Sequence, residues 1–240
     1  MKYFLIYFFF SFFLACNEDV KTYDLKFFDY KFESEGKLHL SHENEKWKIM
    51  NFLGNSIDSG EFKEGVRYGD WFLSKKGNLS LQNWSIVENS SLKVKTNIPY
   101  KIDSIKYSDY YIKVLLSQND YLNNVTFIID NPDNKNRNID MENVFAESTK
   151  FIKENNWHFE VKRLYEKKMN RPFYLDEYSI KDSLNNLFYF SHFYTKLTSG
   201  KLFEITCKGS DNNLETKILS YKIIMNTFVE GERVYNPFIN

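Results

Sequence analysis

The sequence has few of the residues that usually build covalent or metal-linked frameworks. Its 240 residues include two cysteines, Cys16 and Cys207, and four histidines. It lacks the C-x-x-C, G-x-S-x-G and G-x-x-x-x-G-K-[ST] patterns of metal or redox sites, nucleophile elbows and phosphate loops. The 32 basic residues balance the 32 acidic ones, so no net field favours nucleic acid. We expect no cofactor, no metal and no nucleic-acid partner.

Two weaker patterns leave catalysis open only as a third-ranked function. His39 and His42 have H-x-x-H spacing without the glutamate of the H-E-x-x-H zinc motif. Asp176, Glu177 and Asp182 are close enough in sequence to suggest paired carboxylates, but acid–base pairs also need a cleft and a set separation. We therefore assign no catalytic residue and expect a protein that is not an enzyme, with a hydrolase as the least favoured alternative.

The first sixteen residues carry the clearest motif of the chain. Lys2 is followed by an apolar run of about a dozen residues that ends in Phe13-Leu14-Ala15-Cys16. A membrane-spanning helix needs roughly 20 apolar residues, so this pattern is typical of a secretory signal peptide over residues 1–15. An ordinary signal with an incidental cysteine, or an uncleaved anchor, is the alternative.

Phe13-Leu14-Ala15-Cys16 resembles the lipobox of bacterial lipoproteins, although that family prefers Leu where Phe13 stands. The resemblance implies cleavage before Cys16, attachment of a diacylglycerol to its sulfur, and acylation of the new amine. It also implies a protein of the cell envelope, anchored to a membrane on the periplasmic or outer-membrane face. Residues 16–35 are then expected to form a tether and a first strand.

Aromatic residues make up 18% of the chain, and they favour strands. Glycines are concentrated before residue 78, and the four prolines all follow it. This shift predicts a β-rich segment over residues 36–90 and a second domain over residues 91–240.

In Leu202–Lys208, alternation places Cys207 on one face with Phe203 and Ile205, which predicts a buried cysteine.

Residues 60–79 of the first segment resemble a MORN-like repeat. Phe62, Gly65, Gly69, Trp71 and Gly77 occupy its aromatic and glycine positions. The resemblance covers about one repeat, and a plain antiparallel meander is the alternative. In either case we expect a small β-hairpin segment that leans on the rest of the protein.

The second segment shows a regular order of predicted elements. Strands are expected at 110–116, 125–130, 158–165, 173–180, 187–197 and 202–208, with a helix at 141–155. Asp211-Asn212-Asn213 opens a last helix whose apolar positions form one core-facing stripe: Leu214, Ile218, Tyr221, Met225 and Phe228.

This order resembles the Mog1/PsbP-like fold, which includes LpqN-like and DcrB-like envelope proteins. The resemblance implies an α+β fold, with an antiparallel sheet flanked by helices, and a non-catalytic binding or assembly role for an envelope protein or small ligand. An immunity or inhibitor lipoprotein that neutralises a toxin is the alternative function. For the binding surface we select Tyr174, Tyr178, Tyr189 and Tyr194, because tyrosine favours interfaces. Core tyrosines with satisfied hydroxyls are the other interpretation.

Overall fold

The computed structural model describes most of the chain after residue 20. The described residues are 21–39, 42–51, 56–63, 66–75, 78–99, 101–116, 122–129, 162–168, 171–181, 184–210 and 214–238, with Met141, Asn143, Ala146 and Lys150. The predicted signal peptide, Cys16 and most of the predicted helix 141–155 lie outside them. The four separate residues of that helix are helical.

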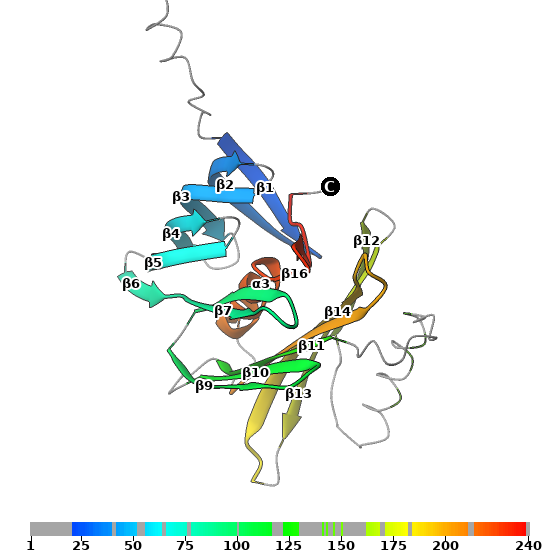
Figure 1. Ribbon diagram of the computed structural model, residues 1–240. Coiled ribbons are helices and arrows are strands. Elements are labelled where there is room, and N and C mark those ends of the chain that lie inside the picture. The colour runs from blue at the N-terminus through cyan, green and yellow to red at the C-terminus, as the bar shows by residue number, and fades with distance from the viewer. Residues whose placement is uncertain are drawn as a thin grey trace, which may run out of the picture.

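The first half of the described chain forms an antiparallel meander in which the strand order follows the chain order (Figure 1). Each strand pairs with the next one in the chain, so all strand pairings in this sheet join segments that are close in sequence. The strands are β1 (Lys21–Phe27), β2 (Tyr30–His39), β3 (His42–Asn51), β4 (Ser56–Lys63), β5 (Val66–Lys75) and β6 (Asn78–Asn83).

The second large sheet has seven antiparallel strands in the order β12-β13-β14-β15-β11-β10-β9. Alternating exposure along β14 and β15 shows that one face is covered by the core. The strands are β9 (Ile102–Tyr107), β10 (Tyr111–Leu116), β11 (Leu122–Ile129), β12 (Lys162–Lys168), β13 (Arg171–Lys181), β14 (Leu187–Lys196) and β15 (Leu202–Gly209).

A four-stranded sheet joins the two halves. Its order is β17-β16-β8-β7, so the hairpin that follows the six-stranded sheet pairs with strands from the end of the chain. The members are β7 (Ser85–Asn89), β8 (Val94–Ile98), β16 (Phe228–Val229) and β17 (Glu232–Arg233). The predicted domain boundary at 90/91 falls in the turn between β7 and β8. The domain division stays a prediction.

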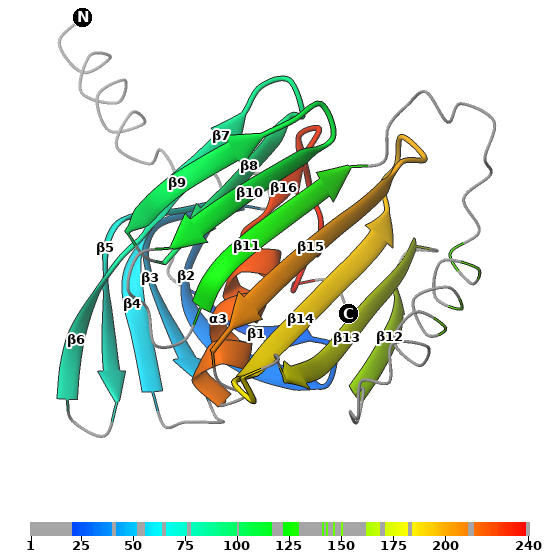
Figure 2. The same cartoon turned by 90° about the horizontal axis from the view of Figure 1, so that it is seen from below.

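Helix α3 (Leu214–Met225) lies between the two large sheets (Figure 2). Its residues are buried on every side from Ile218 onward, as expected for a helix enclosed in a core. The prediction of a core-facing helix is confirmed, but burial extends beyond the single predicted stripe because both sheets contact the helix. The helix also ends at Met225, and Phe228 belongs to β16.

The predicted fold class, an antiparallel sheet flanked by helices, is wrong. Strands dominate the described residues, and α3 is enclosed by sheets rather than laid on an outer face. The predicted small hairpin segment is part of a six-stranded sheet that begins at Lys21. Before residue 60, polar and apolar residues alternate along the chain and aromatic residues are frequent. Both features favour strands and therefore this larger sheet.

One hydrophobic cluster crosses the whole molecule, from Leu25 in β1 to Tyr235 near the end of the chain. The Tyr235 ring contacts Phe27 at 4.7 Å and Phe173 at 5.2 Å between centroids, so it touches β1 and β13 at once. Its hydroxyl accepts a 3.0 Å hydrogen bond from the Phe28 amide and donates one to Glu166. The C-terminal segment therefore ties the two large sheets together.

Two tryptophans of the six-stranded sheet lie directly over glycines of the preceding strand. A Cβ added at Gly36 would be 2.1 Å from the Trp47 ring, and one at Gly60 would be 2.5 Å from the Trp71 ring. The two glycines are 24 residues apart, and so are the two tryptophans. The same structural unit therefore occurs twice, and only glycine leaves room for the ring.

The aromatic residues of these units continue into a row. Tyr23, a further 24 residues before Trp47, stacks on Trp47 with centroids 5.5 Å apart. Phe62 makes edge contacts with Trp47 at 5.9 Å and with Trp71 at 5.0 Å. Edge and offset arrangements of this kind are the favourable geometries for aromatic pairs.

The glycine–tryptophan contacts predict the effect of one methyl group. We expect Gly60→Ala to destabilise the protein by about 1–3 kcal/mol, because overpacking displaces the Trp71 ring. Urea unfolding measures this loss. Ser59→Ala is the matched control, because Ser59 lies next to Gly60 on the other face of β4. Equal unfolding midpoints for both variants would contradict the proposed contact.

Candidate functional site

The four selected tyrosines do not share one face of the seven-stranded sheet. Tyr174 and Tyr178 alternate with Leu175 and Glu177 along β13, and Tyr174 pairs directly with Tyr194 on β14. These three tyrosines lie on the outer face. Tyr189 occupies an inward position of β14 and is fully buried, so the structure separates it from the others.

Tyr174 and Tyr194 form a covered stack on the outer face. Their rings are 5.1 Å apart and nearly parallel, and Met141 and Leu202 pack against them. Tyr194 has no exposed surface, and Tyr174 is 7% exposed. The Tyr194 hydroxyl donates to Asp176 Oδ2 over 3.4 Å. This end of the face is closed by protein.

The neighbouring part of the outer face is half-exposed. Tyr178 stacks on Phe190 at 5.2 Å with an interplanar angle of 5°. His192 Nε2 lies 2.9 Å from Glu204 Oε2 in the next row. Burial raises the pKa of Tyr178 to about 12, with help from the negative charges of Asp176 and Glu204. Tyr178 therefore presents a neutral ring and hydroxyl at neutral pH.

A lysine closes the far side of this half-exposed region. The Lys208 ammonium lies 3.9 Å from the centroid of the Phe188 ring, which is cation–π distance. Aromatic rings thus alternate with a histidine–glutamate pair and a lysine across β13, β14 and β15. We call the set Tyr178, Phe188, Phe190, His192, Glu204 and Lys208 the outer aromatic face.

The inner face of the same strands carries a buried carboxylate. Glu177 Oε1 accepts a 2.7 Å hydrogen bond from the Tyr189 hydroxyl and a short one from Tyr221 on α3. Lys217 Nζ lies 3.8 Å from Glu177 Oε2. Burial, followed by the charge of Glu177, raises the pKa of Tyr189 well above its usual value. The cluster docks α3 on the seven-stranded sheet.

Cys207 is buried on this inner face, which confirms the prediction from its alternation. Burial raises the pKa of its thiol to about 12, although a hydrogen bond with Ser220 acts in the opposite direction. The thiol therefore stays protonated and behaves as a small apolar side chain.

A second buried charge cluster docks α3 on the six-stranded sheet. Asp58 Oδ2 on β4 lies 2.6 Å from Arg67 Nη1 on β5 and 2.5 Å from Lys222 Nζ on α3. The Arg67 guanidinium lies 3.6 Å from the centroid of Trp71 and 4.5 Å from that of Trp84. Sequence reasoning missed this cluster, because its members are up to 164 residues apart.

The pKa values in this cluster follow from burial and from the charges of the partners. Burial alone raises the pKa of Asp58, but Arg67 and Lys222 outweigh it, so the net shift is downward. Burial lowers the pKa of Lys222, and the Asp58 charge opposes that change only in part. Asp58 is therefore the group that keeps two buried cations in place.

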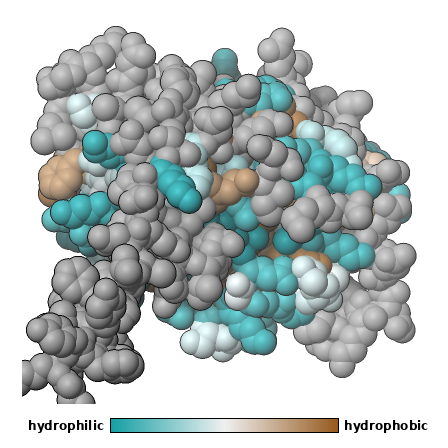
Figure 3. Space-filling model, turned by 90° about the horizontal axis from the view of Figure 1, so that it is seen from above, coloured by the Kyte–Doolittle hydropathy of each residue, from teal (hydrophilic) through white to brown (hydrophobic). Residues whose placement is uncertain are grey.

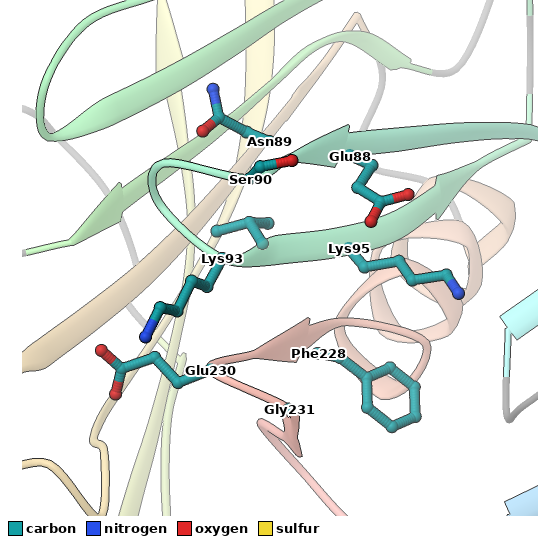
Figure 4. Close-up of a pocket in the computed structure, with 9 residues that line it drawn as sticks. Glu88, Asn89, Ser90, Lys93, Lys95, Phe228, Glu230 and Gly231 are labelled. Carbon is teal, nitrogen blue, oxygen red and sulfur yellow. The ribbon is translucent and has the colours of Figure 1, made fainter.

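An open hollow of about 580 Å³ lies between the β7–β8 turn and the β16–β17 hairpin (Figure 4). Buried Val94 and Phe228 line it together with charged side chains of both signs. Lys201 Nζ binds Glu230 Oε1 at 2.6 Å, and this contact lowers the pKa of Glu230. The lining residues are Glu88, Asn89, Ser90, Lys93, Val94, Lys95, Phe228, Glu230 and Gly231.

Neither a metal site nor a membrane-spanning helix occurs among the described residues. Within this part of the chain, no three His, Cys, Asp or Glu side chains gather closely enough to hold a metal ion. No described helix has the length and apolar character needed to cross a membrane. The face seen from above is mainly hydrophilic where it is described, with hydrophobic residues in small separate spots (Figure 3).

No family model matches the sequence, and no curated protein matches it. Solved structures do resemble it at low identity. The Saccharomyces cerevisiae Ran-binding protein Mog1p has a TM-score of 0.42 and 10% identity, over 66% of this chain and 100% of Mog1p. A Pseudomonas aeruginosa protein of unknown function has a TM-score of 0.40 and 13% identity, over 61% of this chain and 96% of its own.

The cyanobacterial PsbP of Synechocystis has a TM-score of 0.36 and 13% identity, over 61% of this chain and 92% of its own. Two of these proteins, Mog1p and PsbP, bear the names of the fold that the predicted order of strands and helices resembles. Similarity at this level is distant and carries no inference about function.

The Asp58 cluster predicts strongly non-additive mutations. Asp58→Asn leaves two buried cations without a carboxylate, and we expect it to cost about 3–5 kcal/mol of unfolding free energy. Lys222→Met keeps the Arg67–Asp58 pair and should cost less than about 1.5 kcal/mol. In the Lys222→Met background, Asp58→Asn should cost less than it does alone. Additive values in urea unfolding would refute the coupling.

The same carboxylate predicts a stability difference that depends on pH. Because the pKa of Asp58 is lower in the folded protein than the ordinary 3.8, its contribution is complete above that value and is lost as the pH falls through the folded pKa. The gap in unfolding free energy between wild type and Asp58→Asn should therefore shrink on acidification below about pH 4. A gap that is constant across this range would contradict the prediction.

Proposed function

We propose that the protein is a lipid-anchored protein of the bacterial cell envelope that acts as a non-catalytic binding or assembly module. The observation that carries the proposal is the apolar run ending in Ala15-Cys16, only five residues before the first strand. Two or more acyl chains bind a membrane stably, at about 0.8 kcal/mol per buried CH2. A lipidated Cys16 would thus hold β1 close to the membrane.

The outer aromatic face supports the binding part of the proposal. It combines half-exposed rings with a histidine, a glutamate and a lysine, and aromatic residues are enriched at protein interfaces. At the other end of the same outer face, Tyr165 of β12 is 58% exposed and lies beside the covered Tyr174–Tyr194 stack, with its ring centroid 5.0 Å from that of Tyr174. The repeated glycine–tryptophan units support a MORN-like character for the six-stranded sheet, which would act as the scaffold.

The anchor is tested by labelling with radioactive palmitate in cells. Wild type should incorporate the label and enter the membrane fraction, and Cys16→Ser should lose the label. Cys207→Ala is the matched control, because Cys207 is buried and should not change the labelling. Membrane association that does not depend on Cys16 would overturn the lipoprotein assignment.

The binding role is tested by affinity purification of the tagged, full-length protein from detergent-solubilised envelopes. We expect a stoichiometric partner that is lost with Phe188→Lys, which replaces a ring of the outer aromatic face by a charge. Tyr107→Lys is the control, because Tyr107 is 51% exposed on β9, at an edge of the sheet and outside the outer aromatic face. A toxin as partner would instead indicate the immunity or inhibitor role. Turnover of an envelope substrate would indicate a hydrolase.

A further inference from the structure

Strand β6 is the edge of the six-stranded sheet, and it differs chemically from the other edges. It pairs with β5 along one side, and no other described strand pairs with it. Both ribbon views place it at the outer margin of the molecule, with no described element beside its free side (Figures 1 and 2). An open strand edge presents unpaired N–H and C=O groups to any suitable strand.

Proteins commonly protect such edges with charged residues, and this chain does so at its other edges. The edge strands β1, β7, β9, β12 and β17 carry charges in every case. Strand β12, Lys-Arg-Leu-Tyr-Glu-Lys-Lys, has five charged residues among its seven. Strand β6 is Asn-Leu-Ser-Leu-Gln-Asn and contains no charge and no proline. The open edge of β6 therefore lacks protection against pairing.

The outer face next to β6 carries exposed apolar side chains. Leu81 of β6 is 53% exposed and lies directly opposite Phe72 of β5, which is 43% exposed. Tyr68 is 50% exposed on the same face of β5. Trp71 points to the other face, into the core. The apolar surface and the unprotected edge thus meet at one place.

We propose that β6 pairs with β6 of a second copy of this chain in an antiparallel arrangement about a two-fold axis. A neutral strand suits a second copy of itself, because such pairing brings no like charges together. Residues directly opposite each other in a sheet must lie on the same face. The outer face of β6 has the odd-numbered positions 79, 81 and 83, which restricts the self-pairing register.

The register centred on Leu81 satisfies this restriction and extends the apolar row. It places Leu81 opposite Leu81 of the second copy and position 79 opposite position 83. The outer face then carries a continuous row, Phe72 and Leu81 of one copy followed by Leu81 and Phe72 of the other. The two six-stranded sheets become one sheet, and both open edges are closed.

A cysteine scan tests this register directly. Residues opposite each other in an antiparallel pair have Cα atoms about 4.5–5.5 Å apart, which is within disulfide range. In the detergent-extracted full-length protein, Leu81→Cys should therefore form a disulfide-linked dimer on mild oxidation. Asn83→Cys is the control, because its two copies would lie about 13 Å apart. Oxidation of the wild type in parallel controls for the two native cysteines.

A charge placed on the axis tests the association itself. We expect Leu81→Lys to raise the dimer dissociation constant about tenfold or more, because it sets like charges opposite each other and removes the apolar contact. Leu184→Lys, at a site 78% exposed in the β13–β14 turn, should leave it unchanged. Sedimentation of the wild type as a monomer, or equal cross-linking of Leu81→Cys and Asn83→Cys, would overturn the proposal. So would occupation of β6 by a different protein in the purified complex.

Discussion

Two consecutive side chains of α3 hold the two large sheets at a fixed distance from each other. Tyr221 donates to Glu177 of the seven-stranded sheet, and Lys222 binds Asp58 of the six-stranded sheet. Neighbouring residues of a helix point in directions about 100° apart, so a single turn of α3 can reach both sides. Each contact is buried, and a buried carboxylate without its partners is costly. The position of α3 is thus specified from both sheets.

The outer aromatic face depends on this inner arrangement. Glu177 and Tyr189 are fixed from the inside by α3, and they alternate along β13 and β14 with the residues of the outer face. The rings of the outer face are therefore presented by a rigid backbone. The loss of conformational freedom on binding is smaller when the contacting side chains are already ordered.

The strands of the second half were predictable, because their alternation is strong. The predicted ranges 173–180, 187–197 and 202–208 correspond to β13, β14 and β15. The six-stranded sheet was underestimated, because its repeated unit is marked by single glycines and tryptophans 24 residues apart rather than by a continuous motif. The Asp58 and Glu177 clusters could not be derived, because a charged residue in a sequence does not identify its partner. The two-sided burial of α3 likewise depends on the tertiary arrangement, which periodicity does not report.

The glycine–tryptophan unit also bears on how such a chain can change in length over evolution. Strands that are neighbours in the sheet are also consecutive in the chain. A duplicated unit of 24 residues would therefore add two strands and leave the order of the other strands unchanged. Addition of a unit at the β1 end of the six-stranded sheet is blocked, because Phe238 packs on Tyr23 and Trp47 there. Insertion of a unit between β4 and β5 is blocked as well, because Asp58 of β4 binds both Arg67 of β5 and Lys222 of α3. The far end is fixed as well, because the Arg67 guanidinium lies 4.5 Å from the centroid of Trp84, which follows β6. Contacts with the rest of the chain therefore hold the sheet at its present number of strands.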